Sequence, residues 1–79
     1  MKKKREKMFE DLRSRVSLNV SKLRAAQRLT LVQLGAGAGL HWRHIQKIEA
    51  GEGNVTLVTI ARLARGLEVD PYELVATAP

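Results

Sequence analysis

Residues 34–51 read LGAGAGLHWRHIQKIEAG, and their glycines could serve either of two kinds of site. Gly35, Gly37 and Gly39 stand at every second position, and a glycine-rich loop that opens a helix can cradle the phosphates of a nucleotide. A dinucleotide loop, however, needs its third glycine at position 40, where this chain has Leu40, and a P-loop needs a Gly-Lys-Ser/Thr run that is absent here. The glycines are therefore interpreted as a short turn between two helices.

The stretch that follows the glycines carries side chains suited to nucleic-acid recognition. Arg43 can bind guanine through two hydrogen bonds, Gln46 can read adenine, and Lys47 fits either a guanine or a phosphate. If the two isoleucines of this helix face the core, helical geometry directs these three side chains and Trp42 outward. Trp42 is expected to contact DNA at a thymine methyl, a sugar edge or an unstacked base. The alternative is that it packs over a core edge or a dimer interface.

Two histidines in the same stretch could hold a metal ion, but the sequence favours another role. His41 and His44 are spaced i, i+3, as metal-binding pairs can be. No third ligand is evident, and the chain has no cysteine. Hydrogen bonds to phosphates or bases are therefore the preferred interpretation, and no metal or other cofactor is predicted.

The positive charge gathers at one end of this 79-residue chain, which is long enough for one domain. Residues 1–28 contain ten Lys or Arg and three Asp or Glu, a balance of +7, whereas residues 29–79 have a balance of −1. We predict a basic flexible arm at residues 1–7 and a domain at residues 8–79. The arm is expected to be disordered when free. On DNA it could contact phosphates or enter the minor groove, and the alternative is that it only keeps the protein soluble. Its cations are Lys2, Lys3, Lys4 and Arg5.

Several classes of function are disfavoured by what the sequence lacks. No apolar run approaches the ~18 residues that a membrane-spanning helix needs, so no membrane partner is expected. No acid and base are paired, no nucleophile has a partner, and no site for a small-molecule substrate is evident. The sequence therefore predicts a protein that is not an enzyme, and the absence of cysteine suits the cytoplasm.

The apolar residues are spaced as in helices along the whole chain. One stripe predicts either a single long helix or an arm helix that runs into a second: Met8, Leu12, Val16, Val20 and Leu23. Four further helices are predicted from polar residues that can cap their first turns, namely Thr30, His41, Thr56 and Asp70. The predicted fold class is all-α, a compact bundle of five helices.

The side chains that face the core follow from these periods. In the second helix Leu34 and Ala38 are predicted to face inward, and Gly39 to end it in the left-handed conformation. Gly35 is expected where that helix touches a neighbour closely, whereas no reason for Gly37 is apparent. In the fourth helix the inward residues are predicted to be Leu57, Ile60, Ala61, Leu63 and Ala64.

From residue 16 to residue 75 the chain resembles the lambda-repressor/Cro-like (XRE-type) helix-turn-helix regulators. The resemblance lies in VSKLRAAQRLTLVQLGAGAGL and in HWRHIQKIEAGEGNVTLVTIARLARGLEVDPYEL. Within that family the chain is most similar to the small controller proteins of restriction–modification systems. The resemblance implies a dimeric transcription regulator, such as a repressor, of a bacterium or phage that acts at the nucleoid. Such a regulator would bind a palindromic double-stranded DNA operator with the helix at 41–50 in the major groove. The alternative is a protein-interaction module of the same fold, such as the antitoxin of a toxin–antitoxin pair.

The candidates for contacts with the DNA backbone are Thr30, His41, His44 and Asn54, beside the four cations of the arm. The resemblance implies this role for Asn54, although Asn54 also suits an ordinary turn. The chain departs from the family at Leu31, Arg28 and His41, where glutamine, glycine and serine are common. An apolar Leu31, with Val32 beside it, keeps the antitoxin alternative open.

Two structural roles complete the expectations. The resemblance implies an ion pair between Arg24 and Glu49 that orients the reading helix, and the alternative is two unrelated surface charges. One small module makes few base contacts, so a homodimer is expected. Its seam candidates are Leu67, Val69, Tyr72 and Val75, which could instead close the monomer core.

Overall fold

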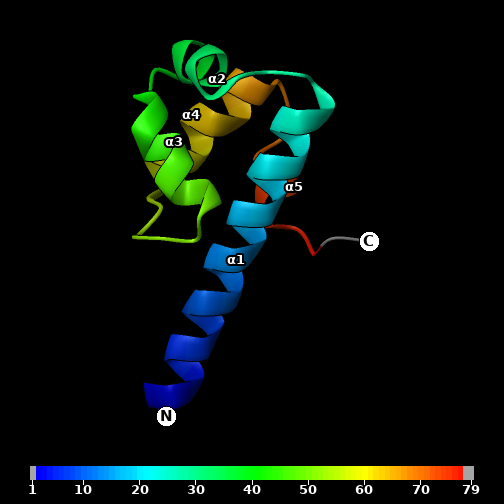
Figure 1. Cartoon of the computed structure of the whole chain (residues 1–79). Helices are drawn as coiled ribbons and strands as arrows, with labels where there is room; N and C mark the ends of the chain where they lie inside the picture. Colours follow the sequence, from blue (N-terminus) through cyan, green and yellow to red (C-terminus); the bar gives the residue numbers. More distant parts are fainter. Residues whose placement is uncertain (1, 78–79) are drawn as a thin grey trace.

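The computed structural model describes residues 2–77, with side chains from Lys4 onward (Figure 1). Its helices are α1 (Lys2–Ala26), α2 (Leu31–Ala38), α3 (Trp42–Glu49), α4 (Leu57–Leu67) and α5 (Tyr72–Val75). This described part of the chain contains no strand, so the predicted all-α fold of five helices is confirmed. None of these helices is long and apolar enough to cross a membrane.

Helix α1 is one long helix rather than two, and its N-terminal half projects from the body formed by the other helices (Figure 1). The longest dimension of the molecule, 40 Å, is about the length of 25 helical residues at 1.5 Å each. Residues 2–7 form the first turns of α1, which differs from the predicted disordered arm. Lysine, arginine and glutamate are good helix formers, and extending an existing helix needs no new nucleus. The side chains of Lys2 and Lys3 and residues 1, 78 and 79 lie outside the described part.

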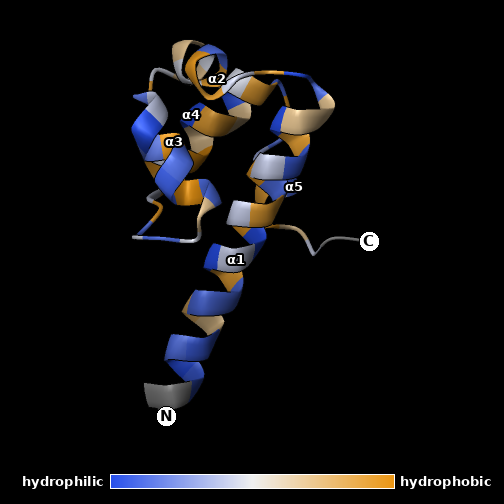
Figure 2. Ribbon diagram, viewed as in Figure 1, coloured by the Kyte–Doolittle hydropathy of each residue, from blue (hydrophilic) through white to orange (hydrophobic). Residues whose placement is uncertain are grey.

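The core forms where α2, α3, α4 and α5 meet the C-terminal half of α1, as the inward-facing hydrophobic segments show (Figure 2). Its buried hydrophobic residues are Val16, Val20, Leu34, Ala38, Ile45, Ile48, Leu63, Ala64, Leu67 and Leu74. The inward positions predicted for α2 and α3 are therefore confirmed.

Two of the inward positions predicted for α4 are wrong. Leu57 is 84% exposed because it begins the helix, beyond the reach of the core. Ala61 is also exposed, since it lies on the helix face opposite to buried Leu63. Thr59 is buried instead, and its hydroxyl accepts a hydrogen bond from the hydroxyl of Thr56, which satisfies it inside the protein.

Two glycines allow α2 to pack closely against its neighbours. A Cβ on Gly35 would lie 2.5 Å from the carbonyl oxygen of Leu40, and one on Gly66 would lie 2.9 Å from the Cβ of Ala38. Neither contact is possible for a real side chain, so the α2–turn and α2–α4 contacts both depend on glycine. The predicted close contact at Gly35 is therefore confirmed.

Local capping bonds fix where the short helices begin. Thr30 and Gln33 form a complete capping box at α2, in which each side chain bonds the other residue's backbone N–H. At α5 the carboxylate of Asp70 accepts from the N–H of Tyr72 at 2.8 Å, and Glu73 accepts from the N–H of Asp70 at 3.2 Å. These are the caps that the sequence predicts.

Candidate nucleic-acid interface

Helices α2 and α3 are joined by a tight turn. Gly39 adopts φ 69° and ψ 34°, the left-handed conformation predicted for it, and the N–H of Leu40 donates to the carbonyl of Gly35 at 3.0 Å. Helix α3 then starts at His41, whose Nδ1 accepts a hydrogen bond from the N–H of Arg43 at 3.1 Å. A histidine thus performs the capping role for which serine is common, so the departure leaves the helix start intact.

Helix α3 has one buried face and one exposed face. Ile45 and Ile48 are buried in the core, whereas Arg43, Gln46 and Lys47 are exposed. A hydrogen-bond fork, an amide and an ammonium group are therefore presented together on one short helix, and these groups match the base edges of a major groove. The structure brings these three sequence-predicted residues to one surface.

Trp42 lies between this exposed face and α2. The residue is half-buried and lines a shallow groove with side chains of α2. Its ring stacks on that of His41 with centroids 5.6 Å apart, and the guanidinium of Arg43 lies 5.4 Å from its centroid. The tryptophan is therefore partly covered beside α2, while the rest of its ring stays accessible beside Arg43, and its contact with DNA stays a prediction.

The remaining backbone candidates lie around this helix. Thr30 is exposed at the start of α2, with its hydroxyl oxygen bound to the N–H of Gln33. His44 is exposed on α3, and Asn54 is exposed in the loop between α3 and α4. Lys4 and Arg5 are exposed on the projecting half of α1, well away from α3 in Figure 1.

The two histidines of α3 have different surroundings. His41 uses Nδ1 for the helix cap, whereas the side chain of His44 is exposed on the surface of α3. Among residues 2–77 no group of three His, Cys, Asp or Glu side chains is arranged to hold a metal ion.

Arg24 of α1 and Glu49 of α3 form a bidentate ion pair. Arg24 Nε donates to Glu49 Oε2 at 2.6 Å, and Nη2 donates to Oε1 at 2.9 Å. The side chains are 23% and 14% exposed, and Arg24 Nη1 also donates to the carbonyl of Leu29 at 2.9 Å. The hydrogen bonds to Glu49 raise the pKa of Arg24, while partial burial acts in the opposite direction and the nearby negative charge adds to the rise. The geometry agrees with the bridge that the resemblance implies.

Three further polar side chains, two in α1 and one directly after it, hold the ends of the other helices, and the sequence reasoning missed all three. Ser17 Oγ donates to the carbonyl of Glu49 at 2.6 Å, which adds a second tie between α1 and the end of α3. Asn19 Nδ2 donates to the carbonyls of Leu74 and Ala76, and Gln27 Nε2 donates to that of Leu67. The available signal was that Ser17 lies seven residues before Arg24 and therefore on the same helix face.

The seam candidates divide into buried and exposed residues. Leu67 is fully buried in the core of its own chain, which is the alternative that the sequence left open, so its side chain is not available to a dimer seam. Val69 and Val75 are partly buried and pack against the core. Tyr72 is 71% exposed and remains available to a partner.

A glycine turn between two helices, the second of which exposes a basic and amide-bearing face, defines the helix-turn-helix class of DNA-binding proteins. The chain belongs to the XRE-type helix-turn-helix family (HTH_3), whose family model matches residues 20–74.

Comparison with individual proteins gives the same class. The chain is similar to the HTH-type transcriptional regulator y4dJ of Sinorhizobium fredii, with 34% identity over 65 residues that cover 82% of this chain and 84% of that protein. It is also similar in structure to the restriction–modification controller protein C.AhdI of Aeromonas hydrophila, with a TM-score of 0.75, 32% identity and coverage of 78% of this chain and 94% of that one. The wild-type restriction–modification controller protein C.Esp1396I is similar with a TM-score of 0.74 and 28% identity, and the match covers 80% of this chain and 82% of that one.

These relatives are regulators rather than enzymes, in agreement with the sequence-based prediction. The chain is accordingly a DNA-binding transcription regulator of the helix-turn-helix type, and its likeness to controller proteins agrees with the resemblance found in the sequence.

Proposed function

We propose that the protein binds a palindromic operator as a homodimer, with α3 of each copy in the major groove, and thereby regulates transcription. The observation that carries this proposal is the exposed face of α3, where Arg43, Gln46 and Lys47 stand together. A helix in the major groove presents such side chains to base edges, and Arg43 is the residue that would bind guanine. The proposed place of action is the cytoplasm.

A base-reading helix must also be held at a fixed angle, and the ties from α1 supply this restraint. The bidentate pair of Arg24 and Glu49 and the bond from Ser17 to the carbonyl of Glu49 both act on the C-terminal end of α3. The buried Ile45 and Ile48 fix the same helix from below. These residues are assigned a positioning role, since none of them faces the DNA side of α3.

Outside α3, the exposed cations of the projecting part of α1 are proposed to add electrostatic attraction to the phosphates. Lys4, Arg5, Lys7 and Arg15 are exposed along this segment. Attraction of this kind strengthens binding to any DNA without selecting a sequence.

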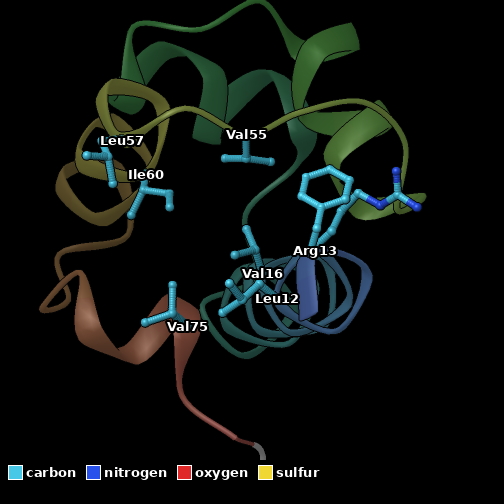
Figure 3. Close-up of a pocket in the computed structure, with 8 residues that line it drawn as sticks. Leu12, Arg13, Val16, Val55, Leu57, Ile60 and Val75 are labelled. Atoms are coloured by element: carbon cyan, nitrogen blue, oxygen red, sulfur yellow. The ribbon is translucent and has the colours of Figure 1, made fainter. Parts of the chain in front are cut away.

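The proposed seam of the homodimer lies at an apolar groove between the projecting half of α1, the start of α4 and α5 (Figure 3). The groove has a volume of about 260 Å³, and Figure 3 shows Leu12, Ile60 and Val75 pointing into the space between the three helices. Leu57 stands exposed at its edge, while Leu12 and Val75 line it. In a two-fold dimer each copy offers the same projecting leucine and the same groove, so one symmetry operation fills both.

The seam is tested by the dissociation constant of the dimer, measured by sedimentation equilibrium. Leu57→Ser should raise it at least about a hundredfold, because two leucine side chains at about 1.5–3 kcal/mol each lose their burial. Leu18→Ser is the matched control, since Leu18 is an exposed leucine on α1 that does not line the groove. Equal dissociation constants for the two variants would remove this face from the proposed seam.

The reading role of α3 is tested by selecting bound duplexes from a random pool and titrating the protein against single-base variants of the consensus. Arg43→Ala should weaken specific binding by roughly 1–3 kcal/mol and remove the preference at one base position. Arg15→Ala is the control, because it removes an equal charge from α1 and should leave the base preference unchanged. An unaltered preference at every position in Arg43→Ala would overturn the proposal.

The antitoxin alternative has one observation in its favour: Val32 is 62% exposed on the outer face of α2. A protein partner could cover such a residue. A second, unrelated chain that binds stoichiometrically through α2 and excludes DNA would support this alternative, whereas salt-sensitive binding to one palindrome supports the regulator.

A further inference from the structure

We propose that the shallow groove between α2 and α3 receives the 5-methyl group of a thymine, so that each half-site carries a thymine next to the guanine bound by Arg43. This inference rests on the proposed placement of α3 in the major groove. It adds a base identity, and the residues that select it, to the proposed function.

The groove is apolar although it borders a basic surface. Val32, Ala36, Leu40 and Trp42 line it, and Gly35 leaves its wall without a side chain. Val32 is 62% exposed. An apolar side chain exposed to water contributes no hydrophobic stabilisation to the fold, so the groove is suited to a small apolar group brought by a ligand.

The polar side chains next to the groove are already engaged within the protein. The side-chain oxygen of Gln33 accepts from the N–H of Thr30 at 2.9 Å, and the hydroxyl oxygen of Thr30 accepts from the N–H of Gln33 at 3.0 Å. His41 accepts from the N–H of Arg43. His41 also lines the groove, and apart from its second ring nitrogen and the indole N–H of Trp42 the lining side chains are apolar.

Among the base edges in a major groove, thymine alone presents a methyl group, and the other groups are donors and acceptors. An apolar groove at this surface therefore fits thymine and disfavours cytosine, whose amino group would lose its water without gaining a partner. The surrounding positive charge of Arg43 and Lys47 suits a duplex, whose phosphates flank every base.

Trp42 joins the groove to the guanine-binding side chain. Its ring lines the groove, and the guanidinium of Arg43 lies 5.4 Å from the centroid of the same ring. A base that packs against the accessible part of Trp42 is therefore a direct neighbour of the base that Arg43 binds. This adjacency predicts a two-base element of guanine and thymine in each half-site.

The test uses the full chain and the consensus duplex selected from the random pool, with deoxyuridine replacing one thymine at a time. Deoxyuridine differs from thymine only by the methyl group, so pairing and all hydrogen-bonding groups stay the same. At the proposed position the affinity should fall about fourfold per half-site, the change that corresponds to about 0.8 kcal/mol for one buried carbon group.

Two variants show whether the groove is responsible. In Val32→Thr a methyl group becomes a hydroxyl with little change of shape, and the fourfold difference between thymine and deoxyuridine should shrink to less than twofold. Val58→Thr is the matched control, because Val58 is a valine of equal 62% exposure on α4, outside this groove, and the fourfold difference should persist.

The outcomes separate this inference from the function on which it rests. If the wild-type chain selects a consensus and no thymine is sensitive to loss of its methyl group, the groove inference is overturned while the DNA-binding proposal stands. A sensitive thymine whose effect is unchanged in Val32→Thr also overturns it, by placing the methyl contact elsewhere. If the chain selects no sequence at all, the proposed function fails first.

Discussion

The ion pair between Arg24 and Glu49 should contribute more than an exposed pair and less than a fully buried one. Its two hydrogen bonds measure 2.6 and 2.9 Å, and its side chains are 23% and 14% exposed. Exposed pairs contribute about 0–1 kcal/mol, whereas breaking a buried pair costs about 3–5 kcal/mol. We expect Glu49→Gln to lower the free energy of unfolding by about 2 kcal/mol, with a coupling energy of about 1–2 kcal/mol between the two positions.

Arg24→Met should be the more damaging of the two single variants. It leaves Glu49 as a partly buried charge and also removes the bond from Nη1 to the carbonyl of Leu29, which adds about 1 kcal/mol. Because the pKa of Arg24 is raised in the folded state, its contribution is complete below the ordinary pKa of arginine and is lost only as the pH rises through the raised value. A measurement near pH 7 therefore reports the full effect of the guanidinium.

The assay is a double-mutant cycle on Arg24→Met and Glu49→Gln by urea unfolding, with the slope against urea checked for constancy across the four proteins. A second cycle on Arg15→Met and Glu68→Gln serves as the control, since these exposed charges lie near the middle of α1 and at the end of α4 and should be additive. A coupling energy in the first cycle as small as that in the control would refute the reasoning.

The remaining predictions concern the backbone and the charged arm. Gly37→Ala should raise the free energy of unfolding by up to about 1 kcal/mol, because a Cβ there would meet α4 at an ordinary contact distance of 3.5 Å. Gly35→Ala should lower it, because a Cβ there would lie 2.5 Å from the carbonyl oxygen of Leu40, and thermal unfolding of both variants measures the difference. Arg28→Gly should add about 0.5–1 kcal/mol to the free energy of unfolding, since Arg28 holds φ 56°, and a loss of stability would show that its side chain matters more than this conformation. Deletion of residues 2–5 should weaken binding to all duplexes alike and flatten the slope of log K against log salt, and an unchanged slope would leave the arm with a solubility role only.

The features that the sequence predicts correctly depend on short stretches of chain. Thr30 caps α2 and Gly39 ends it because capping bonds and the left-handed conformation involve only residues within one helical turn. The outward face of α3 follows equally directly from the spacing of Ile45 and Ile48, since a helix fixes which side chains share a face.

The features that it predicts wrongly or not at all depend on where separate helices end in space. Leu57 has the spacing of a core residue, but no neighbour reaches the first turn of α4 to cover it. Leu67 is apolar, as a residue of a dimer seam would be, but its side chain is fully buried in the core of its own chain. The bonds of Ser17 and Gln27 join side chains to backbone carbonyls 32 and 40 residues away. Every residue has a backbone carbonyl, so the amino-acid sequence does not indicate which one a side chain binds.

The bonds from α1 to the ends of the other helices also bear on how the chain folds during synthesis. Helix α1 carries Asn19, whose partner carbonyls at Leu74 and Ala76 are translated 55 and 57 residues later. At about 5–20 residues per second, Asn19 waits roughly 3–11 s for the carbonyls that bind its amide. The contact between α1 and α5 can therefore form only after α2, α3 and α4 have been translated.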